Sequence, residues 1–372
     1  MSGAAVASIA ARSLSIPFRV AFKHAAAERA QTAAVWVEAR DAAGHAGCGE
    51  GCPREYVTGE SVAGALAFID AHREVLRREV GDVASLAAYA QRHEAAIDAS
   101  PAAWCALELA LLDLFGCAAG CSVEALLGLP ELAGPFRYTA VLGDASLEAF
   151  SAQAQQYRRL GFDDFKVKLS GDRARDGARL EALAGLGAAR IRVDANNLWR
   201  SPVEALAHLA SLPAPLFAVE EPLGAGDLDG LAAVADALGV PVILDESCAR
   251  AGPIRTLPGP AARWIVNVRV SKMGGIGRAL AAVAAAREAG VRVIVGAQVG
   301  ETSVLTRAAL PVAAAAGGAL AGQEGAFGTL LLAQDVAAPS LMFGAGGVLD
   351  PAPVAGRPGL GLALRPPGPA AP

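Results

Sequence analysis

The chain has 372 residues, of which 53% are hydrophobic and 19% are charged, and 32 basic and 37 acidic residues give a net charge of -5. This length and apolar content favour a barrel-sized domain with a smaller partner and exclude a disordered chain. The charge is slightly acidic and dispersed, so it gives no basis for binding nucleic acid or an anionic membrane.

Cysteine use and hydropathy indicate a reduced, aqueous setting. The longest uncharged stretches, such as residues 308–323, are interrupted by proline and glycine, so we expect no membrane span. Arg12 lies early and no basic segment leads into a leucine-rich core, so we expect no secretory signal. Six cysteines in a chain of this length do not resemble a disulfide scaffold. We therefore expect reduced thiols and a cytoplasmic location.

The first 135 residues predict an α+β domain. Alternating apolar residues indicate strands at 4–16 and 32–39, joined through the glycine-rich stretch 44–51. Helical patterns follow at 60–80, 83–97 and 101–118. Strands followed by helices are typical of an α+β unit. The tail, residues 341–372, is rich in Gly and Pro, and we expect it to return to this domain rather than to hang loose.

Residues 136–340 alternate between short apolar runs and helical patterns. Successive polar run-ends fall 24 to 26 residues apart, which is one strand, one loop and one helix per repeat. This repeat predicts a parallel (β/α) barrel. An open doubly wound sheet is the alternative, but the Gly-rich fingerprint that it would carry after an early strand is absent. The expected strands are residues 138–142, 165–169, 191–194, 217–220, 242–245, 265–269, 291–295 and, more weakly, 319–324.

Three acidic residues, Asp194, Glu220 and Asp245, end three consecutive predicted strands. The carboxyl ends of barrel strands converge on one mouth, so we expect these carboxylates to lie close together. Unpaired, they would repel each other, and a bound cation resolves this repulsion. Oxygen ligands favour Mg²⁺ first and Mn²⁺ second, and no His or Cys pattern supports zinc. The alternative for each residue alone is a helix cap.

Only four of the basic residues are lysines, and Lys166 and Lys168 lie two apart on one predicted strand. They therefore point to the same side. Two ammonium groups near a divalent cation are expected to lower each other's pKa, the condition for a neutral lysine base. A metal and a lysine base together predict removal of the proton beside a substrate carboxylate, through an enediolate, with Lys168 as the base.

Five short motifs at these strand ends resemble the enolase superfamily, and within its mandelate racemase/muconate lactonizing enzyme family the muconate lactonizing enzyme subgroup. The motifs are Lys166-Val-Lys168, Asp194-Ala-Asn196, Glu220-Glu-Pro222, Asp245-Glu-Ser247 and Lys272-Met-Gly-Gly275. The resemblance implies a (β/α)7β modified TIM barrel, class α/β, with an N-terminal α+β capping domain. It also implies Asp194, Glu220 and Asp245 as metal ligands, Lys168 as base with Lys166 as its electrostatic partner, and a homo-oligomer.

The same resemblance implies substrate contacts from two mobile segments of the cap, residues 18–31 and 49–56. Further candidates lie at the barrel mouth, where Gln298 and Glu301 have no assigned role. The candidate substrate-binding residues are His24, Arg29, Arg54, Tyr56, Asn196, Gln298, Glu301 and Glu324.

One position departs from the family. Racemases and epimerases of this subgroup carry a second lysine on the sixth strand in an Asn-x-Lys pattern, where this chain has Asn267-Val-Arg269. Arginine does not lose its proton, so it cannot return one as a base, although it can bind an anion. The region 322–325 also lacks the Asp-x-Asp pattern of dipeptide epimerases. Both departures favour one-base chemistry on a small carboxylate, by syn elimination or cycloisomerisation.

Two alternatives remain open. One is an amino-acid or dipeptide racemase or epimerase in which Lys272 or water returns the proton. The other is a barrel without activity, retained for binding after the loss of the second base. The metal set and Lys168 favour an enzyme over this last alternative.

Overall fold

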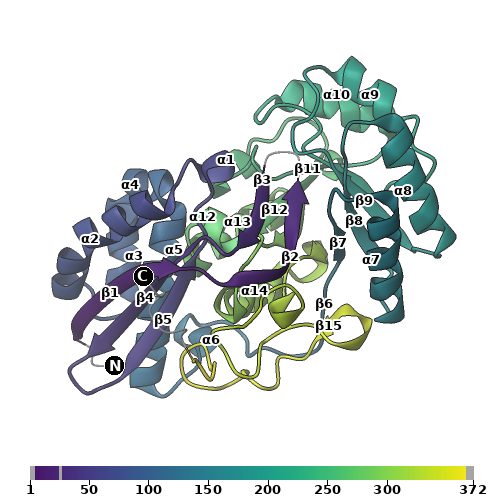
Figure 1. Ribbon diagram of the computed structural model, residues 1–372. Coiled ribbons are helices and arrows are strands. Elements are labelled where there is room, and N and C mark those ends of the chain that lie inside the picture. Colours follow the sequence, from purple (N-terminus) through teal and green to yellow (C-terminus); the bar gives the residue numbers. More distant parts are fainter. Residues whose placement is uncertain (1–4, 25–26, 366–372) are drawn as a thin grey trace.

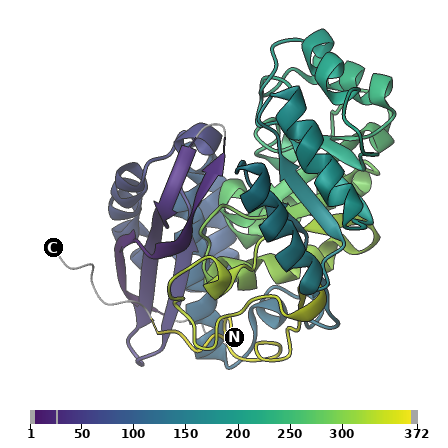
Figure 2. The same cartoon turned by 45° about the vertical axis from the view of Figure 1, so that its right-hand side comes forward.

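The computed structural model describes residues 5–24 and 27–365, with only the backbone described at residues 20–24 and 27–29. A strand-and-helix unit formed by the N-terminal part of the chain lies beside a larger barrel (Figure 1). The second view shows the two parts side by side, with the C-terminal tail, in yellow, running beneath both (Figure 2).

The N-terminal unit, here called the cap, is a three-stranded antiparallel sheet covered by helices. Its strands are β1 (Val6–Leu14), β4 (Ala34–Asp41) and β5 (Ala46–Gly51), in the order β1-β4-β5. The helices are α1 (Glu55–Thr58), α2 (Val62–Glu79), α3 (Val83–Arg92), α4 (Glu94–Ala99), α5 (Pro101–Ala119) and α6 (Val123–Leu126). The helix predicted over 83–97 is divided at His93, which has non-helical dihedral angles.

Most of the glycine-rich stretch forms β5, an edge strand of this sheet, so its prediction as a simple connection was wrong. Gly49 lies on β5 against α5, where an added Cβ atom would be 2.0 Å from the carbonyl oxygen of Ala106. Gly47 and Gly51, on the same face of the strand, meet carbonyl oxygens of α5 at similar distances. These alternate glycines let the helix backbone lie directly against the strand.

We expect Gly49→Ala to destabilise the protein by about 1–3 kcal/mol, because the added methyl group forces α5 away from β5. Urea unfolding measures this loss. Gly185→Ala is the matched control, because nothing lies within 4 Å of a Cβ atom at that helical position. Equal stability of the two variants would contradict the close approach of helix and strand.

Helix α5 is long and apolar enough to cross a membrane, with a mean hydropathy of 1.6. However, 83% of this segment is buried inside the protein. It is the central helix of the cap, and every residue from Pro101 to Gly116 is buried.

The barrel is an eight-stranded parallel sheet in sequential order, β7 to β14. Its edges meet where the Thr139 N–H donates to the Gln323 carbonyl oxygen, at 2.8 Å. All eight predicted strands are confirmed, and β14 ends the series without a helix of its own, which gives the (β/α)7β form. The strands are β7 (Ala140–Leu142), β8 (Asp164–Lys168), β9 (Arg190–Asp194), β10 (Ala218–Glu220), β11 (Val242–Leu244), β12 (Trp264–Arg269), β13 (Arg292–Gly296) and β14 (Leu320–Gln323).

Helices surround the sheet on its outer side (Figure 1). Inside the barrel, small and branched side chains form a layer below the mouth: Ala218, Ile243, Ile265, Ile294 and Ala321. The helices are α7 (Leu147–Arg159), α8 (Arg173–Gly185), α9 (Pro202–Leu209), α10 (Leu228–Leu238), α11 (Ala251–Ile254), α12 (Val270–Met273), α13 (Ile276–Glu288) and α14 (Ser303–Ala316).

Two buried carboxylates of the cap bind the N-termini of barrel helices. Glu50, at the end of β5, accepts hydrogen bonds from the Thr302 backbone N–H (3.1 Å) and hydroxyl (2.6 Å) at the start of α14. Glu108 of α5 accepts a hydrogen bond from the Gly277 N–H at the start of α13. These contacts fix the cap on the barrel through N–H groups at helix N-termini, which have no partner within their own helix.

The carboxyl group of Glu50 makes stability depend on pH. Burial raises the pKa of Glu50 from 4.5 to about 7, although its hydrogen bonds to Thr302 oppose this shift. The folded protein therefore holds this proton more tightly than the unfolded chain, and the resulting stabilisation, complete below pH 4.5, is lost as pH rises through about 7.

Glu50→Gln lacks this titrating group, so its free energy of unfolding should not fall with pH for this reason. Between pH 4.5 and 8 we expect the free energy of unfolding of the variant to rise relative to that of the native protein by up to about 3 kcal/mol. Denaturant unfolding at several pH values measures this difference. Glu74→Gln, at an exposed position, is the control and should run parallel to the native protein. A constant difference for Glu50→Gln across the pH range would show that Glu50 does not titrate on folding.

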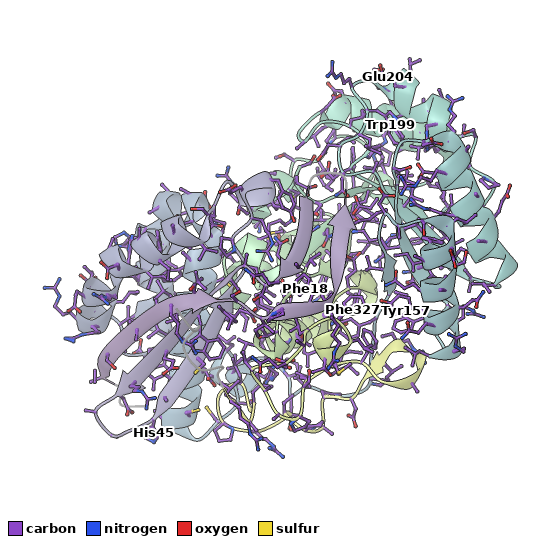
Figure 3. All side chains as sticks on the ribbon, viewed as in Figure 1. Phe18, His45, Tyr157, Trp199, Glu204 and Phe327 are labelled. Carbon is purple, nitrogen blue, oxygen red and sulfur yellow. The ribbon has the colours of Figure 1, made fainter. Side chains whose placement is uncertain are left out.

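A hairpin of β2 (Pro17–His24) and β3 (Ala27–Gln31) extends from the cap sheet and lies over the barrel in the view of Figure 1. Its base is fixed to the segment that follows β14, because the Arg19 N–H donates to the Leu331 carbonyl oxygen at 2.7 Å. Phe18, labelled near the centre of Figure 3, also lies against Gly300 of the loop that follows β13. The base of the hairpin therefore lies beside two loops of the mouth.

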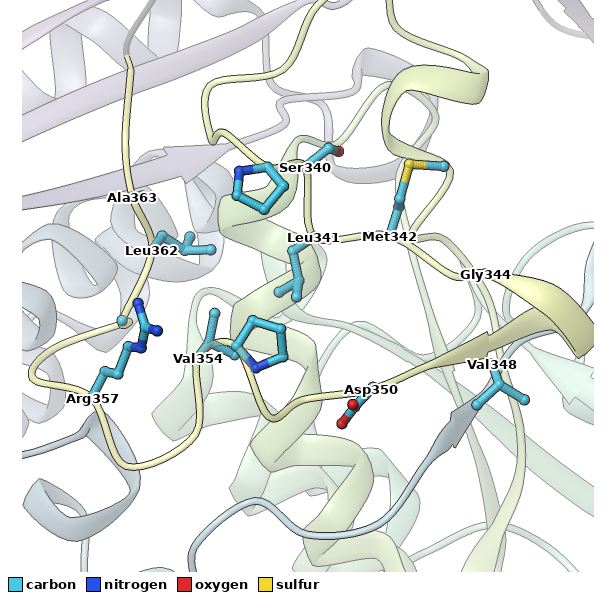
Figure 4. Close-up of a pocket in the computed structure, with 13 residues that line it drawn as sticks. Ser340, Leu341, Met342, Gly344, Val348, Asp350, Val354, Arg357, Leu362 and Ala363 are labelled. Carbon is cyan, nitrogen blue, oxygen red and sulfur yellow. The ribbon is translucent and has the colours of Figure 1, made fainter.

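The C-terminal tail packs against both parts through its described residues, up to 365. β15 (Val348–Leu349) pairs with β6 (Phe136–Arg137), and the Leu360 N–H donates to Asp113 of α5. A hollow of about 460 Å³ lies within the tail, between residues 339 and 363 (Figure 4). None of the candidate site residues lines it.

Candidate active site

Charged side chains alternate in sign around the barrel mouth. The Lys166 Nζ atom lies 3.0 Å from Asp194 Oδ2 and 2.7 Å from Glu220 Oε2. Arg269 contacts Asp245, with Glu220 Oε1 3.8 Å away. The three predicted carboxylates are all about 99% buried. The structure thus brings together the residues that the strand spacing predicted to converge, with basic side chains between them.

Lys168 is held at the rim of the mouth by two oxygen atoms. Its Nζ atom donates to Asp194 Oδ2 at 3.0 Å and to Asn196 Oδ1 at 2.8 Å. Asn196 follows β9 with a φ of 45°, a left-handed conformation that Asn tolerates better than most residues. The predicted substrate-binding residue Asn196 therefore orients the amine of Lys168.

Lys166 lies among three carboxylates, and these control its pKa in the ion-free site. Burial by itself would lower the pKa of Lys166, but Asp194, Glu220 and Glu324 outweigh it and raise this pKa above its usual value. This direction applies to the site without an ion, so the mutual lowering expected beside a bound divalent cation stays a prediction. The ammonium group of Lys166 remains charged between the carboxylates, as a fixed electrostatic partner rather than a proton acceptor.

Arg269 lies across the mouth from Lys168, because β8 and β12 are four strands apart in an eight-stranded barrel. Its Nη1 atom donates to Gln298 Oε1 at 2.9 Å. Glu301 supports Gln298 by accepting its backbone N–H at 2.6 Å. The predicted residues Gln298 and Glu301 are thus joined to Arg269 in one group on the β12–β13 side.

Lys272 lies behind Asp245 and does not line the mouth. Its Nζ atom donates to Asp245 Oδ1 (2.9 Å) and to the backbone carbonyl oxygens of Asp245, Asn267 and Cys248 at 2.7 to 3.0 Å. Only 1% of the residue is exposed. Burial, and then the charge of Arg269, lowers the pKa of Lys272 to about 8. The prediction of Lys272 as a catalytic residue is corrected to a positioning role at Asp245.

The carboxylates of the mouth fit a hard divalent cation in donor chemistry. Asp194, Glu220 and Asp245 offer only oxygen atoms, and a buried oxygen of the neighbouring Glu246, Oε2, has no hydrogen-bond partner in the described chain. As the side chains stand, no three His, Cys, Asp or Glu residues among those described form a complete metal site. Lys166 and Arg269 lie between the carboxylates, so a bound ion would have to displace part of these contacts.

Two acidic residues of the site were not singled out from the sequence. Glu221, with a φ of 39°, accepts hydrogen bonds from the backbone N–H groups of Asp245 (2.6 Å) and Ser247 (2.8 Å). It thereby holds the loop that presents Asp245. Burial, and then the negative charges of Glu221, Asp194 and Glu220, raises the pKa of Glu246 to about 7. Both were visible as second residues of their motifs, Glu220-Glu and Asp245-Glu.

Several predicted substrate contacts have other partners. The Arg54 guanidinium group is 99% buried and donates to the carbonyl oxygens of Ala33, Pro53 and Val299, each at 2.7 Å. It therefore joins the cap to a barrel loop, which corrects its prediction as a substrate ligand. Tyr56, in α1, is 38% exposed. The side chains of His24 and Arg29 lie outside the described residues.

Glu324 also turns inward rather than towards a substrate. Its carboxylate lies 2.6 Å from Arg192 Nη2 and 3.4 Å from Lys166 Nζ. Although burial alone would raise it, the pKa of Glu324 is lowered to about 2 because Lys166 and Arg192 stabilise the charged form. Glu324 was predicted to bind substrate, and the structure corrects this: it contacts Lys166 and Arg192 instead.

Comparisons with known proteins agree with this fold. Residues 149–367 match the family described as "Enolase C-terminal domain-like". An L-Lys-D/L-Arg epimerase of Methylococcus capsulatus is 32% identical over 94% of this chain and 95% of the relative. The crystal structure of a dipeptide epimerase from Enterococcus faecalis V583 complexed with Mg and L-Leu-L-Tyr superposes with a TM-score of 0.84. That comparison has 26% identity and covers 98% of this chain and 100% of the other.

A cycloisomerase is equally similar in fold. The 2-chloromuconate cycloisomerase of Rhodococcus opacus 1CP has a TM-score of 0.84 and 25% identity, with 97% of each chain covered. The fold therefore fits epimerases and cycloisomerases equally well.

Proposed function

This chain belongs to the enolase superfamily, in its mandelate racemase/muconate lactonizing enzyme family, and we propose that its Lys168 removes the proton beside the carboxylate of a small substrate. The single observation that carries this proposal is the position of the Lys168 amine, at the end of β8 beside Asp194 and on the rim of the carboxylate group. A neutral amine so placed can take a proton from a substrate that enters the mouth.

Asp194, Glu220 and Asp245 are the proposed ligands of the magnesium ion. Bound there, the ion would supply a Lewis acid that makes the proton beside a coordinated carboxylate more acidic. Lys166, which stays charged, orients Asp194 and Glu220 and adds positive charge below the reacting group. Asn196 directs the lone pair of Lys168 once its proton has left.

We propose that Arg269 decides what happens to the enediolate intermediate after the proton is removed. An epimerase needs a proton to return on the opposite side of the substrate, which Arg269 cannot provide because it stays protonated. Lys272, the other lysine of that region, is held behind Asp245. We therefore favour one-base chemistry, elimination or cycloisomerisation, in which Lys168 acts alone.

A second candidate is the epimerisation of dipeptides or acylated amino acids. It is supported by the names of relatives, which include the L-Lys-D/L-Arg epimerase above and an N-succinyl-L-Arg/Lys racemase of Bacillus cereus. Epimerases and racemases outnumber the chloromuconate cycloisomerase among the similar proteins, so the names of relatives favour epimerisation, whereas Arg269 in this chain favours one-base chemistry.

Incubation in D₂O with Mg²⁺ tests both candidates. The substrates are L-L dipeptides, N-succinyl amino acids, unsaturated dicarboxylates and β-hydroxy carboxylates, whose hydroxyl group can leave as water in an elimination. The products are followed by NMR and optical rotation. One-base chemistry gives deuterium exchange without loss of optical rotation, or a new alkene or lactone. Epimerisation gives deuterium together with the inverted product. No Mg²⁺-dependent exchange with any of these substrates would contradict the proposal and favour a barrel used for binding alone.

A further inference from the structure

The barrel mouth contains two neighbouring hydrogen-bond donors that the protein itself leaves unused. Arg269 Nε and Gln298 Nε2 are buried, and neither has a hydrogen-bond partner in the described part of the chain. The two residues are 8% and 3% exposed. A buried donor without a partner is costly, so such a pair at a site entrance indicates that a ligand provides the acceptor.

The orientation of Gln298 follows from its contact with Arg269. A guanidinium group only donates hydrogen bonds, so Gln298 must present its carbonyl oxygen to Arg269 Nη1, 2.9 Å away. The amide nitrogen of Gln298 is then directed away from that bond. Glu301 does not cover it, because its carboxylate accepts the backbone N–H of Gln298 instead.

The charge of Arg269 is only partly balanced within the protein. Its ionic partners are Asp245 and, at 3.8 Å, Glu220, and both carboxylates are also proposed metal ligands that would share their charge with the ion. Asp245 is further shared with Lys272. Burial raises the pKa of the nearby Glu301 to about 8, so this carboxyl group is mostly neutral at pH 7. A positive charge therefore remains available on the β12–β13 side.

The mouth thus separates into two regions of opposite chemistry. On the β10–β11 side, Glu246 Oε2 is a buried acceptor without a partner, as a cation site requires. On the β12–β13 side, opposite Lys168, the unused donors Arg269 Nε and Gln298 Nε2 lie next to a permanent cation. The unused acceptor of that side, Asn267 Oδ1, lies two residues earlier on β12, against Gly296. A cation and a monocarboxylate would occupy only the first region.

We propose that Arg269 and Gln298 form a second anion subsite, which binds a second carboxylate of the substrate opposite Lys168. The inference rests on the proposed function, which places the first carboxylate at the metal. The substrate class is then a dicarboxylate whose first carboxylate lies beside the reacting proton. The subsite occupies the place where a second base would stand. Arg269 therefore selects the substrate on this side and does not return a proton to it.

Isothermal titration calorimetry of the full chain with Mg²⁺ tests the subsite. The probes are succinate and butyrate, which have the same number of carbon atoms but two carboxylates and one. We expect succinate to bind roughly 10- to 100-fold more tightly, as charge-assisted hydrogen bonds to Arg269 would give. Malonate and glutarate, each compared with the monocarboxylate of equal length, test other separations. Equal affinity within every such pair would overturn the proposal.

Two variants locate the effect. Gln298→Glu replaces the donor with a negative group and should abolish the preference for succinate while changing butyrate binding by less than about twofold. Arg269→Met should also bring the ratio of succinate to butyrate affinity close to one, although the loss of its contacts with Asp245 and Glu220 changes the affinity for both probes. Its melting temperature shows whether it is folded. Arg92→Met, which removes an exposed arginine of the cap, is the matched control and should keep the preference. Equal weakening of both probes in Gln298→Glu would overturn the subsite.

The subsite and the proposed function can fail separately. A succinate preference without α-proton exchange on any substrate would retain the subsite and contradict the function. Exchange on monocarboxylates, with no preference for a second carboxylate, would retain the function and contradict the subsite.

Discussion

Replacement of Lys168 by Ala is expected to lower Mg²⁺-dependent α-proton exchange by about 10²- to 10⁴-fold, the usual contribution of a general base. The amine of Lys168 is the basic group on the rim of the mouth that has only two hydrogen-bond acceptors, Asp194 and Asn196. Lys166 is not placed to replace it, because it is only 2% exposed and lies between the buried carboxylates. The measurement is deuterium incorporation into the best substrate in D₂O.

Lys168→Arg is the informative companion to this variant. It keeps the positive charge beside Asp194, but a guanidinium group does not accept a proton near neutral pH. We therefore expect Lys168→Arg to be as inactive as Lys168→Ala, and both variants to retain Mg²⁺ binding in calorimetry. Recovery of exchange in Lys168→Arg would mean that Lys168 acts through its charge and that the proton acceptor is another group.

The sequence predicted the barrel because the barrel repeats a local pattern. Each apolar run ends in a polar residue at nearly constant spacing, so the strands and the convergence of Asp194, Glu220 and Asp245 follow from local periodicity and the geometry of parallel strands. The common side of Lys166 and Lys168 follows from the two-residue period of a strand. These predictions need no knowledge of distant contacts.

The roles of other residues depend on contacts that the sequence does not contain. Arg54 donates to carbonyl oxygens that are 21 and 245 residues away, and such partners leave no pattern in the sequence around Arg54. Glu324 turns towards Arg192, a barrel-interior residue 132 positions earlier, rather than towards the mouth. Long side chains at strand ends can point either way, so their direction is decided by the charges that folding brings near them.

The glycines of β5 show a different limit. Glycine is expected in connections because of its flexibility, and the stretch 44–51 was interpreted in that way. In the fold, Gly47, Gly49 and Gly51 are needed because they lack a side chain, and α5 occupies the space that a Cβ atom would fill. Alternation of glycine with period two was the signal for a strand under a closely packed helix.

Removal of the carboxylate of Glu124 is expected to cause the largest loss of stability. Glu124 of α6 and Arg307 of the barrel helix α14 form two parallel hydrogen bonds of 2.6 and 2.7 Å, and both residues are at least 99% buried. Arg307 also donates to the Leu360 carbonyl oxygen of the tail at 2.8 Å. One guanidinium group therefore joins three segments that are distant in sequence.

We expect Glu124→Ala to lower the free energy of unfolding by about 3–5 kcal/mol, because it leaves the Arg307 charge buried without a partner. Urea unfolding at pH 7 measures this loss. Glu79→Ala, which breaks the exposed pair with Arg92, is the matched control and should cost no more than about 1 kcal/mol. The double variant Glu124→Leu with Arg307→Met removes both charges and should recover much of the lost stability. Similar losses in Glu124→Ala and Glu79→Ala would mean that water reaches Arg307 and that the tail is not held by this pair.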